Sequence, residues 1–162
     1  MIDPQRVDFH EIARRGDTEV MEACLKEGLD PELRDARGFG LLTIAAYNDQ
    51  AAMVELLLDR GANPDGPDGG GNTPLMGTAF KGHAAAARSL LAGGADPDVA
   101  NPAGATALHF SVMFGHREMV ELLLEYDADP GVADQEGRTP LDLARKDGLD
   151  EIAGRLAQGE DE

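Results

Sequence analysis

The chain has 162 residues, of which 31 are acidic and 14 are Lys or Arg, so its formal net charge is −17. This excess of acid opposes binding to DNA, RNA or anionic lipid, because phosphate contacts need a concentrated basic surface. A hydrophobic content of 42% argues against a wholly disordered chain. No apolar run approaches the about 18 residues that indicate a membrane span.

The cysteine content and the first residues bear on location. Cys24 is the only cysteine, so no disulfide can form within the chain. The N-terminal sequence also lacks the basic start and apolar core of a secretory signal. Both features are typical of a reducing compartment, so we expect a cytoplasmic protein.

Two short helices are predicted within residues 3–34. Apolar residues recur at helical spacing, first from Val7 to Ala13 and then from Val20 to Leu25. The intervening segment contains Gly16 and is typical of a helix end followed by a turn. This stretch therefore predicts a helix pair.

From Asp35 onward, one pattern recurs every 33 residues. Each unit opens with a residue that favours turns, and a glycine follows three residues later. The openings are Asp35, Asp68, Asn101 and Asp134, and the glycines are Gly38, Gly71, Gly104 and Gly137.

The second and third units differ in how their first helix begins. In residues 35–67, Gly40 stands where a capping hydroxyl is expected, so this helix start should be softer. In residues 68–100, Thr73 supplies the capping hydroxyl and Pro74 occupies the first turn, where its missing N–H does no harm.

The fourth unit, residues 101–133, shows the pattern in full. Thr106-Ala-Leu-His109 begins its first helix, Gly115-His116 separates the helices, and Asp127-Ala-Asp-Pro130 closes the unit. These segments, repeated at this period, resemble the ankyrin repeat family. The resemblance implies an all-α ankyrin-repeat solenoid, in which helix-turn-helix units stack and are joined by β-turn or hairpin-like loops.

The resemblance covers nearly the whole chain. We expect a single ankyrin-repeat domain at residues 1–157, with degenerate units that cap both ends of the stack. The expected units are residues 3–34, 35–67, 68–100, 101–133 and 134–157, and residues 158–162 form a short acidic tail.

No group of residues indicates catalysis, a cofactor or a metal site. The four histidines lack the close spacing of a zinc site, and no serine has neighbours that would activate it as a nucleophile. The resemblance implies instead that histidines such as His109 support hydrogen bonds between turns and helices. We therefore expect a protein that is not an enzyme and that holds neither cofactor nor metal.

The resemblance also implies that the turn tips and first helices form a concave face that binds partners. Exposed aromatic residues beside methionine and arginine are typical of binding hot spots. A simpler interpretation is that these aromatic residues pack on one another between neighbouring repeats. The residues that we expect to contact a partner are Arg37, Phe39, Tyr47, Asn48, Phe80, Lys81, Met113, Phe114, Arg138 and Lys146.

Charge is expected to differ between the two sides of the solenoid. The basic residues above lie on the concave side, whereas Glu55, Glu118 and Glu121 lie on second helices. We therefore expect a monomeric, non-catalytic interaction module that binds another protein, not nucleic acid or membrane, on its concave face. The alternative is an acidic inhibitor or immunity-type protein that blocks a basic, nucleic-acid-binding partner.

Overall fold

The computed structural model describes residues 6–158, which form ten helices and no β-strand. Within that range Arg34 and Gly40 form one isolated bridge. The predicted all-α class is therefore confirmed. The helices are α1 (Phe9–Arg15), α2 (Thr18–Lys26), α3 (Leu41–Tyr47), α4 (Ala51–Asp59), α5 (Pro74–Lys81), α6 (Ala84–Ala92), α7 (Ala107–Met113), α8 (Arg117–Glu125), α9 (Pro140–Lys146) and α10 (Asp150–Gln158).

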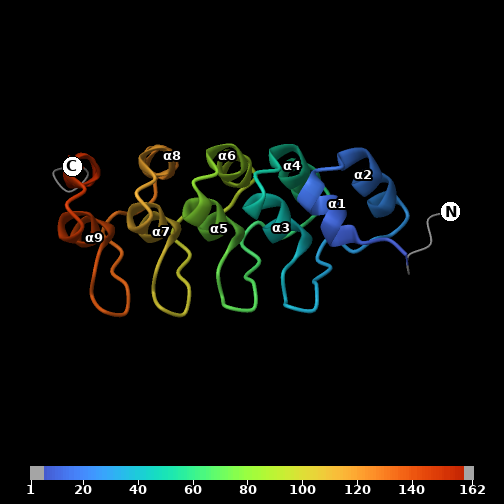
Figure 1. Cartoon of the computed structure of the whole chain (residues 1–162), viewed down its shortest axis with the longest axis horizontal. Coiled ribbons are helices and arrows are strands. Elements are labelled where there is room, and N and C mark those ends of the chain that lie inside the picture. The colour runs from blue at the N-terminus through green and yellow to red at the C-terminus, as the bar shows by residue number, and fades with distance from the viewer. Residues whose placement is uncertain (1–5, 159–162) are drawn as a thin grey trace.

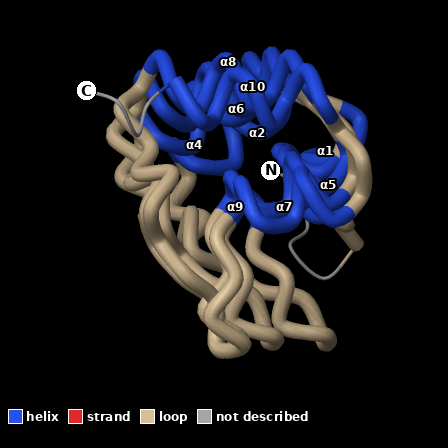
Figure 2. The backbone as a smooth tube through the Cα atoms, turned by 90° about the vertical axis from the view of Figure 1, so that its left-hand side faces the viewer, coloured by secondary structure: helices blue, strands red, loops and turns tan. Residues whose placement is uncertain are grey.

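The helices form two parallel rows along the long axis of the molecule. In Figure 1 the odd-numbered helices make one row, the even-numbered helices make the other, and the long loops project from the odd-numbered row. Viewed along the stack, the loops leave the helices at a steep angle (Figure 2). The predicted solenoid is therefore present. We call the side that carries the odd-numbered helices and the loop bases the first-helix face.

Two residue-level expectations concern the ends of the chain. The predicted helix pair in residues 3–34 is present as α1 and α2. Gln158, expected to begin the acidic tail, is instead the last residue of α10. Residues 159–162 of that tail lie outside the described residues.

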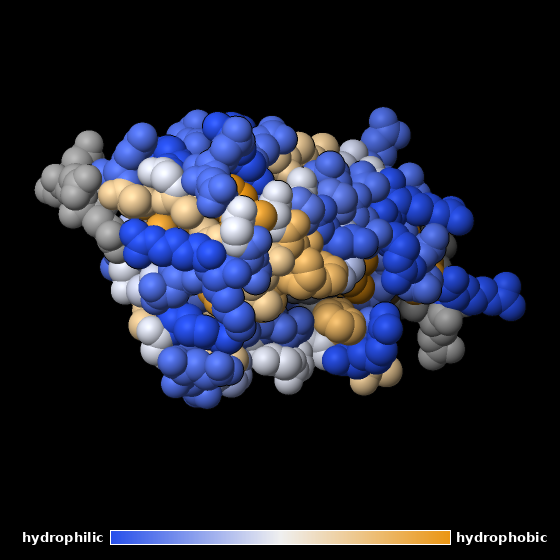
Figure 3. All heavy atoms as spheres, turned by 60° about the vertical axis from the view of Figure 1, so that its left-hand side comes forward, coloured by the Kyte–Doolittle hydropathy of each residue, from blue (hydrophilic) through white to orange (hydrophobic). Residues whose placement is uncertain are grey.

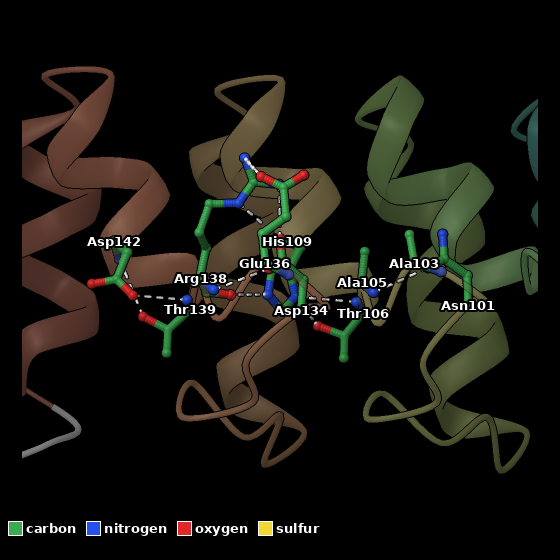
Figure 4. Close-up of polar contacts among 10 residues, drawn as sticks. All are labelled: Asn101, Ala103, Ala105, Thr106, His109, Asp134, Glu136, Arg138, Thr139 and Asp142. Atoms are coloured by element: carbon green, nitrogen blue, oxygen red, sulfur yellow. Dashed lines mark hydrogen bonds and ion pairs between the residues drawn. The ribbon is translucent and has the colours of Figure 1, made fainter.

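Each long loop is held by one side-chain oxygen that accepts two backbone hydrogen bonds. The Oδ1 atom of Asp134 lies 2.9 Å from the Glu136 amide nitrogen and 3.0 Å from that of Arg138 (Figure 4). Gly137 completes the turn with a φ of 78°, which a residue with a side chain adopts only with strain. Asp35, Asp68 and Asn101 accept the equivalent pairs of bonds in the earlier loops.

His109 joins the fourth unit to the fifth. Its imidazole is fully buried, and its Nδ1 atom accepts a hydrogen bond from the Thr106 amide at 3.1 Å. Its Nε2 atom lies 3.0 Å from the carbonyl oxygen of Arg138 in the next loop (Figure 4). Since Nδ1 accepts, Nε2 carries the hydrogen and donates it to that carbonyl. The histidine thus ties a helix start to the following turn.

The unusual turn of the second unit makes a contact of its own across the stack. Asp49 has a φ of 56°, in the left-handed region where glycine is the usual residue. Its Oδ1 atom accepts a hydrogen bond from the Ala86 amide at 3.1 Å, in the first turn of α6. Asp49 therefore caps a helix of the next unit, which offsets the strain of its own backbone.

The absence of a side-chain cap at α3 agrees with the sequence. Gly40 provides no capping bond to α3, whereas the Thr73 hydroxyl accepts a bond from the Met76 amide at the start of α5. The first helix of the second unit depends instead on burial, because all residues from Leu41 to Ala46 are buried.

We expect His109→Ala to lower the free energy of unfolding by about 2–4 kcal/mol. The substitution empties a fully buried position, leaves the Thr106 amide without a partner and removes one of the two hydrogen bonds that the Arg138 carbonyl accepts. Urea unfolding followed by circular dichroism measures the effect. Met113→Ala on the same helix is the control, because that side chain is exposed. Equal stability of the two variants would contradict this role of His109.

Acid should weaken the fold through the turn carboxylates. The hydrogen bond from the Arg138 amide, followed by the bond from the Arg138 side chain, holds the pKa of Asp134 below its ordinary value. A carboxyl whose pKa is lowered by folding stabilises the folded state at neutral pH. That contribution is lost as the pH falls through the folded-state pKa.

The variant Asp134→Asn tests this effect, because Asn101 already occupies the equivalent position and accepts the same bonds. We expect wild type to lose more stability than Asp134→Asn between about pH 5 and pH 3. Urea unfolding at several pH values measures the difference. Asp59→Asn on α4 is the control, and a wild-type pH profile matched by Asp134→Asn would refute the prediction.

Candidate partner-binding face

Successive first helices end in side chains that the stack does not bury. Tyr47 ends α3, Phe80 lies in the last turn of α5 and Met113 ends α7, at equivalent positions of three units. Their exposed fractions are 40%, 37% and 49%, and that of Phe114 is 44%. Because the repeat places these residues one above another, they form a continuous exposed line along the first-helix face.

Three of these side chains contact one another, and we call Tyr47, Phe80 and Phe114 the aromatic row. The Tyr47 and Phe80 rings are stacked, with centroids 6.0 Å apart and planes at 15°. The Phe80 and Phe114 rings meet edge to face, with centroids 4.5 Å apart and planes at 74°. The rings therefore pack between repeats, as the simpler interpretation expects, yet each remains more than one third exposed.

A hollow of about 590 Å³ lies beside the aromatic row, and we call it the central hollow. This volume falls within the range of about 300–1,000 Å³ that ligand-sized pockets have. In the space-filling view, apolar residues gather in a band between hydrophilic surfaces (Figure 3). The apolar side chains that line the central hollow are Phe39, Ile44, Tyr47, Met76, Phe80 and Phe110.

Cationic groups lie around the aromatic residues. The Arg37 guanidinium lies 5.1 Å from the centroid of the Phe39 ring, and the Lys81 ammonium lies 5.1 Å from that of Tyr47. Both distances permit a cation–π attraction. Within residues 6–158 no carboxylate lies within ion-pair distance of Lys81. The first-helix face therefore combines apolar surface with positive charge, although the whole chain is acidic.

A family model described as ankyrin repeats in three copies matches residues 9–101 and again residues 76–161. The chain belongs to the ankyrin repeat family. Ankyrin repeats are generally protein–protein interaction modules and are typically not catalytic. No curated protein matched the chain.

The ankyrin stack brings together some of the ten residues predicted to contact a partner. Arg37, Phe39, Tyr47, Asn48 and Phe80 line the central hollow. Lys81 and Phe114 adjoin it through their contacts with Tyr47 and Phe80, and Met113 lies exposed at the equivalent position of the next unit.

Two of the ten residues lie apart from this group. Arg138 is half-buried, and its guanidinium bonds to the Asp134 carboxylate at 2.9–3.0 Å and to Glu136 at 3.2 Å. It is therefore committed to its own turn. Lys146 is exposed at the end of α9 and does not line the central hollow.

Two aromatic residues beside the central hollow are half-buried. Phe39 was expected to be exposed, but it is half-buried and packs against the hydrophobic core. Phe110, which is not among the ten residues predicted to contact a partner, is also half-buried and lines the central hollow. Both residues border the central hollow, so their positions in the repeat do not by themselves decide their exposure.

Gly77 is a part of the central hollow that the sequence analysis missed. It lies within α5, where Ile44 and Phe110 occupy the equivalent positions of the neighbouring units. A signal was present in the sequence, since glycine is unfavourable in a helix interior and usually has a packing or functional reason there.

Carboxylates on the second helices are partly paired across the stack. Glu22 of α2 bonds to Arg60 at 2.8 Å, and Glu121 of α8 bonds to Arg155 of α10 at 3.0 Å. Glu55 accepts a hydrogen bond from the Ser89 hydroxyl at 3.0 Å. These pairs reduce the number of free carboxylates on the outer side of the ankyrin stack.

Residues 6–158 also show features that bear on other types of site. Residues 6–158 contain no group of three or more His, Cys, Asp or Glu side chains arranged to hold a metal ion. Cys24 is buried, as expected for a small hydrophobic residue. None of the helices in this range has the length and apolar character required to cross a membrane.

We expect Phe80→Ala to cost about 1–2 kcal/mol of stability, less than the about 3–5 kcal/mol of a fully buried phenylalanine. Phe80 already exposes 37% of its surface, so its removal leaves little cavity. Circular dichroism and urea unfolding measure helicity and stability. Leu75→Ala on the same helix is the buried comparison. If both variants lose equal stability, Phe80 belongs to the core and not to an exposed face.

Proposed function

We propose that the chain is a non-catalytic interaction module that binds another protein across its first-helix face. The observation that carries this proposal is the aromatic row, which remains exposed beside an apolar hollow. Single exposed hydrophobic residues are normal on soluble proteins, but a contiguous set beside a hollow marks an interaction site. Membership of a family of protein–protein interaction modules supports the same conclusion.

Different residues have different roles in this proposal. Tyr47, Phe80 and Phe114 are the central anchors, since aromatic residues bury much area with few rotatable bonds. Arg37 and Lys81 lie at the edge, where charges guide orientation and speed association more than they add affinity. Met113 extends the apolar line, and Asn48 lies at its side.

The remaining two predicted contacts are peripheral in this proposal. Lys146 lies exposed at the C-terminal end of the face, where a long partner segment would reach it. Arg138 stabilises the last loop through Asp134, so its contribution to binding is indirect. We further propose that the protein acts as a cytoplasmic monomer and that its net charge of −17 excludes nucleic acid as the partner.

The alternative is an acidic inhibitor that occupies a basic, nucleic-acid-binding protein surface. Its support is the net charge and the free carboxylates of the second helices, such as Asp59 and Glu118. The ion pairs between successive second helices count against it, because paired carboxylates attract a basic partner less strongly. It also leaves the aromatic row without a role.

Affinity capture from a lysate of the source organism tests the proposal. The comparison is between wild type and the triple variant Tyr47→Ala/Phe80→Ala/Phe114→Ala, with helicity checked by circular dichroism. We expect the folded triple variant to lose a protein that wild type retains. Once that protein is known, Phe80→Ala alone should weaken its binding by about 2 kcal/mol, the scale of a hot-spot residue.

A matched control carries three substitutions on the second helices, Val20→Ala/Asp59→Ala/Glu118→Ala. All three positions are exposed and lie away from the aromatic row. The control should retain the captured protein. Loss of capture by the control, with retention by the aromatic variant, would refute the proposal and favour the acidic inhibitor.

A further inference from the structure

Gly77 is unfavourable for the stability of the helix that contains it. It lies inside α5, and glycine in a helix interior is less stable than alanine by roughly 0.5–1 kcal/mol. No positive φ explains it, because Gly77 is not among the glycines with left-handed backbone. The neighbouring units place Ile44 and Phe110 at the same position, so the repeat itself does not require glycine there.

The missing side chain at Gly77 leaves space that contributes to the central hollow. A Cβ atom at this position would lie 3.2 Å from Cδ2 of Tyr47, so the Tyr47 ring rests against the backbone of α5. Gly77 and Tyr47 both line the central hollow. A longer side chain at Gly77 would occupy part of that space and push the Tyr47 ring aside.

We propose that the space over Gly77 is an anchor pocket for one large apolar side chain of a partner segment, with acidic residues of that segment beside the anchor. This inference deepens the proposed function and rests on it. The walls of the pocket that meet the apolar group are Ile44, Tyr47, Phe80 and Phe110. Apolar clefts with a few placed polar or charged groups are the usual form of a selective site.

Charge at the pocket specifies the acidic flanks. Arg14 and Arg37 both line the central hollow, in a chain whose net charge is −17, and the carboxylate among the described lining residues, Asp68, accepts hydrogen bonds from the Gly70 and Asn72 amides. Arg14 pairs with Glu11 and Arg37 lies 3.9 Å from Asp35, but the arginine side chains in these pairs are exposed. Exposed pairs are weak, so a carboxylate of the partner can replace them. Lys81, over the Tyr47 ring, adds positive charge at the same edge.

Selection of peptides from a phage library of short random sequences tests the pocket. Wild type is the bait, and enriched peptides are synthesised and their Kd values measured against wild type and variants. We expect enriched peptides to share a large apolar residue flanked by Asp or Glu. Gly77→Met, which fills the space, should weaken their binding by at least about tenfold.

Two alanine variants distinguish an effect on binding at the pocket from an effect on the stability of the fold. Gly154→Ala in α10 is the matched control, since it is also a glycine within a helix and has no atom within 4 Å of the added Cβ. Gly154→Ala should raise the midpoint of thermal unfolding, because alanine favours helix, whereas at Gly77 the shift of the Tyr47 ring offsets that gain; both variants should stay folded. Only Gly77→Ala should weaken peptide binding. Arg37→Gln should weaken binding most at low salt.

Several outcomes of the peptide selection would contradict the proposed anchor pocket. These are no enriched peptides, peptides with basic flanks or without an apolar residue, or peptides that bind Gly77→Met as tightly as wild type. Binding of the protein captured from the lysate distinguishes failure of the anchor pocket from failure of the proposed function. A protein whose capture requires the aromatic row but not Gly77 would leave the proposed function standing and remove the pocket.

Discussion

No unit of this protein has helices long enough to be stable alone. The helices contain seven to nine residues, whereas isolated helices shorter than about 12–15 residues are marginal in water. Stability therefore comes from apolar side chains buried between neighbouring units, such as the fully buried Ala45, Ala79 and Ala144. Small residues at these positions let the helices approach closely. This contact fixes the spacing of the side chains that are exposed on successive units.

That spacing explains how a chain with few aromatic residues exposes them as one surface. The stack needs the inner positions of each first helix and leaves the last turn free. Tyr47, Phe80 and Met113 occupy this free position in three successive units, and the common spacing aligns them. The residues that define the repeat are needed for packing and for the turns. A binding surface therefore has to be made from positions at which the repeat requires no particular residue.

The sequence was sufficient for the fold and for part of the candidate site. Periodicity predicted the helix pairs, the turn residues and the exposure of Tyr47 and Phe80, because each follows from position within a repeat. It did not predict the central hollow, which depends on side chains from several units and on the absence of one at Gly77. Arg138 shows the same limit, since its ion pair with Asp134 depends on loop geometry.

Polar side chains near the turns join neighbouring units of the stack. The Asp49 carboxylate caps α6 of the following unit, while the neighbouring Gln50 donates to the Arg14 carbonyl of the preceding one. Between the third and fourth units, His116 makes the bond equivalent to that of Gln50, to the Phe80 carbonyl. The same bond is therefore made by different residue types at different junctions, and each of these side chains bonds to a backbone group. Because a backbone partner is present whatever the neighbouring side chain, one unit can change the residue that makes the contact without a matching change in the next unit.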